Sequence, residues 1–337
     1  MAILFTKLSC LADDQGSQAK PKVWIYTDMS DKTLPGGNHR GTINDPDDIS
    51  AMAGYLLMSN EFETLGIVVA STNRPDHAKT PHQGEWAKRF FGNAYAVDQI
   101  PLNQRLGEYP VELPFMESSI KSTAERFDPA QDYKSLLKFN TVQALLDKVH
   151  HTDEVIHVLC WGSLTEPAIL VRHLISTHQN DLLSRLKFIA HWTNSPLHQG
   201  SVEHPEDVAN CREDAEACLY LKTAAKNGLI SYYECGAIGQ HGIVSGAPKG
   251  KDFYDQFRTS RLGQIFVEGK FVRDRVDHSD SATYWILLGR YGVSLADIAS
   301  NGTNSVEVEL RNEEKFRSAS SKIHEELLRR SRAAANH

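Results

Sequence analysis

The chain of 337 residues has the length and composition of an ordinary globular protein. Apolar residues make up 41% and charged residues 23%, and the formal charge is −7 at pH 7, all within usual globular ranges. The length allows one large domain and does not demand two. The acidic balance predicts no nucleic-acid partner. No run approaches the roughly 20 apolar residues that span a bilayer, so we expect no membrane partner.

The first 21 residues predict a tail that precedes the domain. Residues 13–21 are polar and rich in small side chains and show no period. The apolar start is interrupted by Lys7, which is untypical of a signal peptide. We therefore expect a cytoplasmic protein, with a truncated signal and a periplasmic or secreted location left open.

The cysteines predict buried free thiols and no disulfide scaffold or zinc site. Their number is odd, and no two of them are spaced as CxxC, so neither framework is indicated. They are Cys10, Cys160, Cys211, Cys218 and Cys235.

Short apolar runs then alternate with amphipathic segments. In chain order we predict strand 23–27, helix 49–58, strand 65–70, helix 141–149, strand 155–160, helix 164–174, strand 186–192, helix 214–225 and strand 229–234. This alternation predicts an α/β fold with a mostly parallel central sheet and helices on both faces. Asp28, residues 71–73 and Trp161 follow predicted strands, and ligands bind at the carboxyl ends of such strands.

Other segments break this alternation. Residues 31–44 predict a long glycine-containing loop, 94–135 an irregular segment, and 240–280 a lid or excursion near the site. Residues 312–334 predict a charged surface helix. The predicted organisation is a tail (1–21), an α/β domain (22–311) and a C-terminal charged helix (312–337).

An acidic cluster is the main chemical signal. Asp28 ends a predicted strand, and Asp45, Asp47 and Asp48 open a predicted helix. Carboxylates held this close repel one another, and burying them unpaired is costly. A divalent cation removes that cost, and calcium suits a site of hard oxygen ligands. The alternative is structural, because aspartate is also a favoured helix N-cap.

Five segments together resemble the nucleoside hydrolase superfamily. Within it, the chain is most similar to the nucleoside-hydrolase-like domain of a cellulose-binding-associated bacterial family. The resemblance covers most of residues 22–290, and its segments are TDMS with DPDDISA and YLLMSNEF (27–62), LGIVVASTN (65–73), VLCWGSLTEPAILV (158–171), NCREDAEA (210–217) and HSDSATYWILLG (278–289).

The resemblance implies a metal set and a sugar-contacting set. Calcium would be held by the carboxylates of Asp28, Asp48 and Asp280 and by the backbone carbonyl of Trp161. Sugar hydroxyls would be bound by Asp47, Asn73 and Asn210. The structural alternatives stay open: Asn73 as a turn cap, Asn210 and Asp280 as helix caps, and Trp161 as a packed aromatic.

The implied activity is hydrolysis of an N-glycosidic bond, with Asp28 as the general base that activates water. The leaving-group acid stays open between His278, one position from the expected place, and His241. Asp28 and Asp47 also lie farther apart in sequence than is usual in the superfamily, and Tyr26 and Val208 stand where acidic residues are expected.

We therefore predict a calcium-dependent hydrolase of a small nucleoside or glycoside, in a chain that could form homo-oligomers. The alternative is a carbohydrate-binding module that retains the calcium and sugar clamp without turnover. A structural domain with an incidental acidic surface is the third reading.

Overall fold

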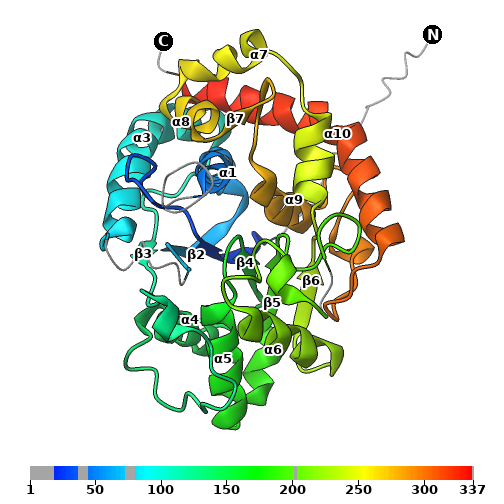
Figure 1. Ribbon diagram of the computed structural model, residues 1–337. Coiled ribbons are helices and arrows are strands. Elements are labelled where there is room, and N and C mark those ends of the chain that lie inside the picture. Colours follow the sequence, from blue (N-terminus) through cyan, green and yellow to red (C-terminus); the bar gives the residue numbers. More distant parts are fainter. Residues whose placement is uncertain (1–18, 37–44, 73–79, 201–202, 336–337) are drawn as a thin grey trace, which may run out of the picture.

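A six-stranded sheet forms the centre of the computed structural model, which describes residues 19–36, 45–72, 80–200 and 203–335 (Figure 1). The strands are β1 (Lys22–Thr27), β2 (Glu63–Val69), β3 (Phe115–Glu117), β4 (Ile156–Cys160), β5 (Leu186–Ala190) and β6 (Ser231–Glu234). Their order is β3-β2-β1-β4-β5-β6, and every neighbouring pair is parallel. The predicted fold class is confirmed.

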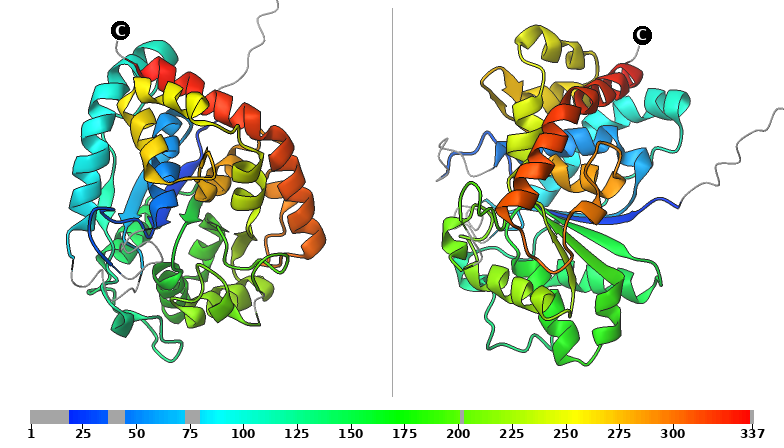
Figure 2. Two further views of the ribbon diagram at one scale, coloured as in Figure 1. Left: turned by 45° about the horizontal axis from the view of Figure 1, so that its top comes forward. Right: turned by 90° about the vertical axis from the view of Figure 1, so that its right-hand side faces the viewer.

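Helices cover both faces of the sheet (Figures 1 and 2). One layer contains α1 (Pro46–Leu57), α3 (Gln83–Leu106), α8 (Arg261–Gly269), α9 (Ala282–Leu288) and α10 (Val306–Ala334), and the other contains α4 (Asn140–His150), α5 (Thr165–Ser176) and α6 (Ala215–Lys226). Strand β1 shows why both faces are buried. Its side chains alternate between them, with Val23 and Ile25 in one core and Trp24 and Tyr26 in the other.

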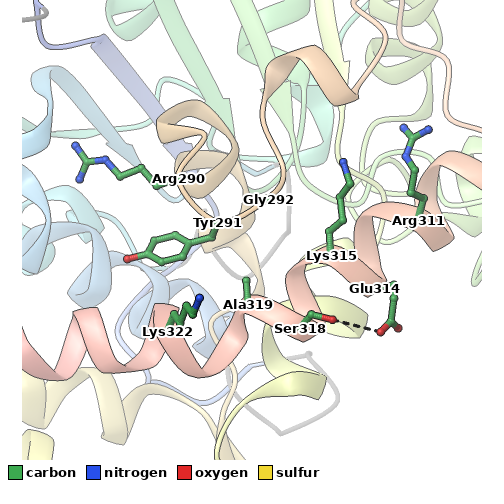
Figure 3. Close-up of a pocket in the computed structure, with 9 residues that line it drawn as sticks. All are labelled: Arg290, Tyr291, Gly292, Arg311, Glu314, Lys315, Ser318, Ala319 and Lys322. Atoms are coloured by element: carbon green, nitrogen blue, oxygen red, sulfur yellow. Dashed lines mark hydrogen bonds between the residues drawn. The ribbon is translucent and has the colours of Figure 1, made fainter.

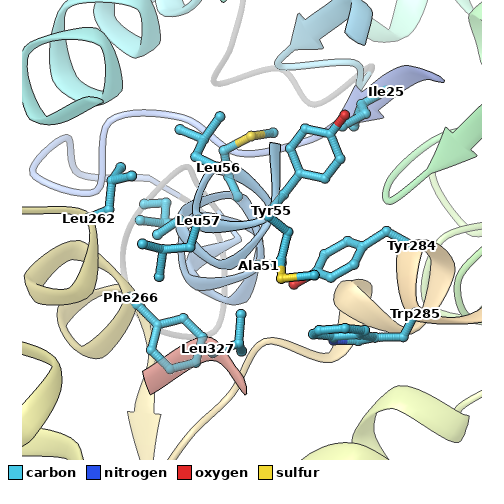
Figure 4. Close-up of a cluster of buried hydrophobic side chains, with 14 of the residues drawn as sticks. Ile25, Ala51, Tyr55, Leu56, Leu57, Leu262, Phe266, Tyr284, Trp285 and Leu327 are labelled. Atoms are coloured by element: carbon cyan, nitrogen blue, oxygen red, sulfur yellow. The ribbon is translucent and has the colours of Figure 1, made fainter. Parts of the chain in front are cut away.

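Helix α1 lies in the middle of the first layer, and nearly all of its residues are buried. Leu262 and Phe266 of α8, Leu327 of α10 and Tyr284 of α9 surround it (Figure 4). A helix that is apolar all round needs such a fully covered position. Gly54 permits the close packing, because a Cβ there would lie 2.9 Å from the Tyr284 hydroxyl. The helix that opens with the acidic residues is therefore held firmly.

The segment predicted to be irregular, 94–135, begins inside α3. The prediction failed there because Pro101 lies within the helix, and proline normally ends one. The predicted excursion at 240–280 contains the π-helical segment Gly239–Val244, α7 (Lys251–Asp255), α8 and a hairpin of β7 (Phe271–Val272) and β8 (Arg275–Val276). Among the described residues, no helix is long and apolar enough to cross a membrane.

Two of the cysteines depart from the predicted free thiols. Cys211 and Cys218 form a disulfide, whereas Cys160 and Cys235 are buried free thiols as predicted. Cys211 lies in the loop between β5 and α6, and Cys218 lies in the first turn of α6. A pair of cysteines seven residues apart does not by itself indicate a disulfide in the sequence.

Candidate metal and sugar site

The predicted acidic residues lie where the strand order of the sheet reverses. The chain runs from β1 outward to β3 and then returns to place β4 beside β1, and ligands bind at such switch points. Asp28 follows β1 and Trp161 follows β4, and the N–H of Trp161 donates to the carbonyl of Tyr26 at 2.9 Å. Gly162 allows the close approach, because a Cβ there would lie 2.7 Å from the Cβ of Asp28.

Helix α1 aims its first turn at the end of β1. The buried carboxylate of Asp48 accepts hydrogen bonds from the Thr27 hydroxyl and, at 3.1 Å, from the N–H of Asp28. Asp45 is the N-cap residue of α1, yet its side chain makes no capping hydrogen bond. The two hydrogen bonds of Asp48 direct its carboxylate toward the end of β1.

Asp280 reaches the same place from the far end of the chain. It lies in the 3₁₀ turn Ser279–Ser281, ahead of α9, whose N-cap residue is Ser281. One carboxylate oxygen from each of Asp47, Asp48 and Asp280 lies within 4.8 Å of the others. The helix-cap alternative for Asp280 therefore fails, and segments more than 200 residues apart converge on one point.

A short relay fixes Asp280 against the sheet. The indole Nε1 of Trp161 donates to the Thr283 hydroxyl at 2.7 Å, and that hydroxyl donates to the carbonyl of Asp280 at 2.8 Å. The buried indole of Trp161 is thus a positioning group, in addition to any role of its carbonyl.

The cluster carries more negative charge than its surroundings compensate. Burial and the neighbouring carboxylates raise the pKa of Asp48 and of Asp280 well above the ordinary value. The pKa of Asp45 is raised in the same way, first by burial and then by Asp47. Several hard oxygen atoms that repel one another are the donor set that calcium accepts, so these residues fit a divalent ion.

Among the described residues, the lysine that enters the cluster is Lys270, which the sequence analysis did not identify. The Nζ of Lys270 lies 2.9 Å from the carboxylates of both Asp47 and Asp277. Burial alone would raise the pKa of Asp47, but the Lys270 ammonium outweighs it and holds that pKa below the ordinary value. Burial and Asp47 raise the pKa of Asp277 to about 6. Lys270 gave no sequence signal because it lies at the junction of a helix and a hairpin.

A cavity of about 300 Å³ opens beside the cluster. It is lined by Asp45, Asp47, Asp48, Trp161, His191, Trp192, Ala209, Asn210, Gln240, Lys270, Asp277 and Asp280. Trp192 has a φ of 51°, which is unusual for a bulky residue, and its N–H donates to the carbonyl of Gly236 at 3.1 Å. Backbone strain of this kind concentrates at functional sites.

Asn210 reaches the cavity but caps no helix. Helix α6 is capped by Asp214, which accepts from the N–H of Ala217 at 3.2 Å. The amide nitrogen of Asn210 donates instead to the carbonyls of Trp161 at 3.1 Å and His191 at 2.9 Å. The Trp161 carbonyl, which is the proposed metal ligand, therefore already accepts one hydrogen bond from Asn210. Its second lone pair is left for another partner.

The two candidate acids do not line the cavity. His278 is buried against His324, with 3.1 Å between the two Nε2 atoms, and burial lowers its pKa well below the ordinary value. His241 stacks on His198 with the ring centroids 3.6 Å apart, and burial lowers its pKa to about 4. Asn73 lies outside the described residues. Among those described, His191 is the histidine that lines the cavity.

A larger cleft lies elsewhere, between α10 and the turn after α9 (Figure 3). Its volume is about 740 Å³, and most of its charged lining is basic: Arg290, Arg311, Lys315 and Lys322, with Glu314 as the acid. None of the clustered aspartates lines it. The carboxylate chemistry therefore belongs to the smaller cavity at the sheet.

Comparisons with known proteins find relatives of the family and of the fold. Residues 41–192 match the family described as cellulose-binding Sde182, nucleoside hydrolase-like domain. No curated protein matches the chain. The resemblance to nucleoside hydrolase-related proteins is confirmed, and the matched residues carry Asp47, Asp48 and Trp161.

Solved structures share the fold at low identity. A nucleoside hydrolase-related hypothetical protein from Saccharophagus degradans, associated with carbohydrate metabolism, aligns with a TM-score of 0.62 at 13% identity, over 94% of this chain and 72% of that one. The type III effector protein XopQ complexed with adenosine diphosphate ribose aligns with a TM-score of 0.50 at 14% identity, over 91% of this chain and 95% of that one.

Proposed function

Because residues 41–192 match a nucleoside hydrolase-like family and the whole fold agrees, we propose that this chain is a calcium-dependent hydrolase of N-glycosidic bonds. Its substrate is a small nucleoside or a related glycoside. The observation that supports this most is the convergence of Asp47, Asp48 and Asp280 at one cavity at the switch point of the sheet. Burying these carboxylates together has no structural benefit without a cation.

Four groups would hold the ion: the carboxylates of Asp28, Asp48 and Asp280 and the carbonyl of Trp161. When bound, calcium would supply positive charge, orient a water molecule and bind sugar hydroxyls. These ligands lie directly after β1, in α1, directly after β4 and in the turn before α9, so the site forms only in the folded chain.

The other residues act on the sugar and on the water. Asp28 accepts the proton of the attacking water as general base. Asp47 accepts a hydrogen bond from a sugar hydroxyl, and Asn210 and Asn73 contact the remaining hydroxyls. The carboxylates of the cluster favour the positive charge that develops on the ring in an oxocarbenium-like transition state.

The histidines near the site are poorly suited to donate a proton to the leaving group. This observation favours the alternative function. Burial lowers the pKa of His191 to about 4, so the histidine that lines the cavity is neutral at pH 7. His278 and His241 point to other partners. A carbohydrate-binding module that keeps the calcium and sugar clamp needs no such acid, and the matched family is itself described as cellulose-binding.

Release of free sugar distinguishes the two functions. Purified protein with calcium is incubated with nucleosides and small glycosides, and reducing sugar is measured. We expect release by the wild type and a loss of at least about a hundred-fold in Asp28→Asn, the magnitude of general-base catalysis. Asp132→Asn, at an exposed aspartate paired with Lys134, is the matched control. Sugar binding without any release establishes the binding module.

A further inference from the structure

Lys270 is fixed in the cavity wall by the helix that carries the acidic residues. Its backbone N–H donates to the Ser50 hydroxyl of α1 at 3.0 Å. A Cβ on the preceding Gly269 would lie 2.3 Å from the same hydroxyl, so α8 ends in close contact with α1. The position of the lysine relative to Asp47 is therefore set by packing of the backbone.

The β7–β8 hairpin places Asp277 opposite Lys270. Phe271 pairs with Val276 in the ladder, and the N–H of Asp277 donates to the carbonyl of Lys270 at 2.8 Å. The Lys270 ammonium lies 2.9 Å from Asp277 and the same distance from Asp47. An ammonium has three N–H donors, so one is left after these two ion pairs.

Among the described residues of the wall, Lys270 is the charged donor, and the uncharged side chains that can donate are those of Trp192, His191, Gln240 and Asn210. Carboxylates of ionised aspartates can only accept hydrogen bonds. Asn210 donates to the carbonyls of Trp161 and His191, which uses both of its amide hydrogens and leaves its oxygen. A sugar hydroxyl donates one hydrogen bond and accepts others, so a hydroxyl bound to these acceptors still needs a donor.

From this geometry we propose that Lys270 is a ligand-contacting residue and that Asp47, Lys270 and Asp277 form a subsite for a vicinal diol of an uncharged sugar. The proposal deepens the proposed function and rests on it. One hydroxyl donates to Asp47 and accepts from the remaining N–H of the ammonium, while its neighbour donates to Asp277. An anionic sugar is disfavoured, because five aspartates line the cavity against one lysine.

Calorimetric titration with calcium present tests the subsite. The probes are ribose, 2-deoxyribose and ribose 5-phosphate, and the variants are Lys270→Met, Lys270→Arg and the control Lys251→Met, at an exposed lysine outside the cavity. We expect the wild type and the control to prefer ribose over both other probes. Lys270→Met should bind ribose at least about ten-fold more weakly, as for a lost hydrogen bond from a charged group, and Lys270→Arg should recover part of the affinity.

The calcium-induced shift in melting temperature shows that each variant is folded and keeps the ion. Unchanged ribose affinity in Lys270→Met overturns the subsite and leaves the proposed function standing. Preferred binding of ribose 5-phosphate, lost in Lys270→Met, overturns it in favour of an anion site. Absence of sugar binding by the wild type overturns the proposed function and the subsite with it.

Discussion

The N–H of Asp28 donates to the carboxylate of Asp48 at 3.1 Å, across 20 residues of sequence. This contact joins the end of β1 to the first turn of α1, and Asp280 is brought to the carboxylates of Asp47 and Asp48 from the turn before α9. Burial and the neighbouring carboxylates raise the free energy needed to ionise Asp48 and Asp280. Repulsion among these carboxylates lowers the stability of the folded protein, so calcium binding can be detected through the melting temperature.

Calcium should raise the melting temperature, because a ligand that binds only the native state stabilises it by about 2.7 kcal/mol at 100 times its dissociation constant. Asp48→Asn should melt at a higher temperature than the wild type without calcium, since the substitution removes a buried repelling charge. The same variant should lose most of the calcium-induced shift. Differential scanning calorimetry with calcium or a chelator measures both effects. A wild type that does not respond to calcium contradicts the metal site.

The affinity for calcium should rise with pH. Burial and neighbouring carboxylates raise the pKa of Asp48 and Asp280 in the folded state, so the folded protein holds protons that the unfolded chain releases from about pH 4 upward. Stability contributed by these groups therefore falls as pH rises, and calcium, which requires the ionised forms, restores it.

Buried histidines with a lowered pKa, such as His324 at about 4, have the opposite effect, because their contribution to stability increases as pH rises. These histidines affect the calcium-loaded and the calcium-free protein equally, so their contribution cancels when the two forms are compared at the same pH. Calcium titrations at about pH 5.5 and about pH 7.5 should show tighter binding at the higher value. Equal affinities would mean that the carboxylates are not the ligands.

The sequence predicted five of the six strands because these strands are buried on both faces, whereas the short strand β3 lies in the segment predicted to be irregular. Runs such as β4 and β5 are apolar apart from His157 and Lys187, and they need no tertiary information to be recognised. Asp48 and Asp280 were found through the order of the family segments, and the structure brings them together. Lys270 and the Trp161–Thr283 relay could not be found, because they depend on how α8 and α9 pack on α1 and the sheet. Helix α3 was missed in part because Pro101 obscures its pattern.

Thr283 should prove to be a positioning residue for the ion. Thr283→Val leaves the buried Trp161 indole N–H without its acceptor, at a cost of about 1–3 kcal/mol in the free energy of unfolding. It also frees the carbonyl of Asp280, so the calcium affinity should fall by about ten-fold. Thr283→Ser keeps the hydroxyl and should behave like the wild type. Destabilisation of Thr283→Val with normal calcium affinity would limit this residue to a structural role.

If the chain is a hydrolase, its rate should depend steeply on the leaving group. The histidine that lines the cavity is neutral at pH 7, so little acid catalysis is available to a base that must be protonated as it departs. A 4-nitrophenyl riboside, whose leaving group departs without a proton, should be cleaved at least about a hundred-fold faster than uridine, which is the usual contribution of a general acid. His278→Gln should leave both rates unchanged, because that ring contacts His324 away from the cavity. Comparable rates for the two substrates, with a selective loss on uridine in His278→Gln, would restore His278 as the acid and require the segment that carries it to move.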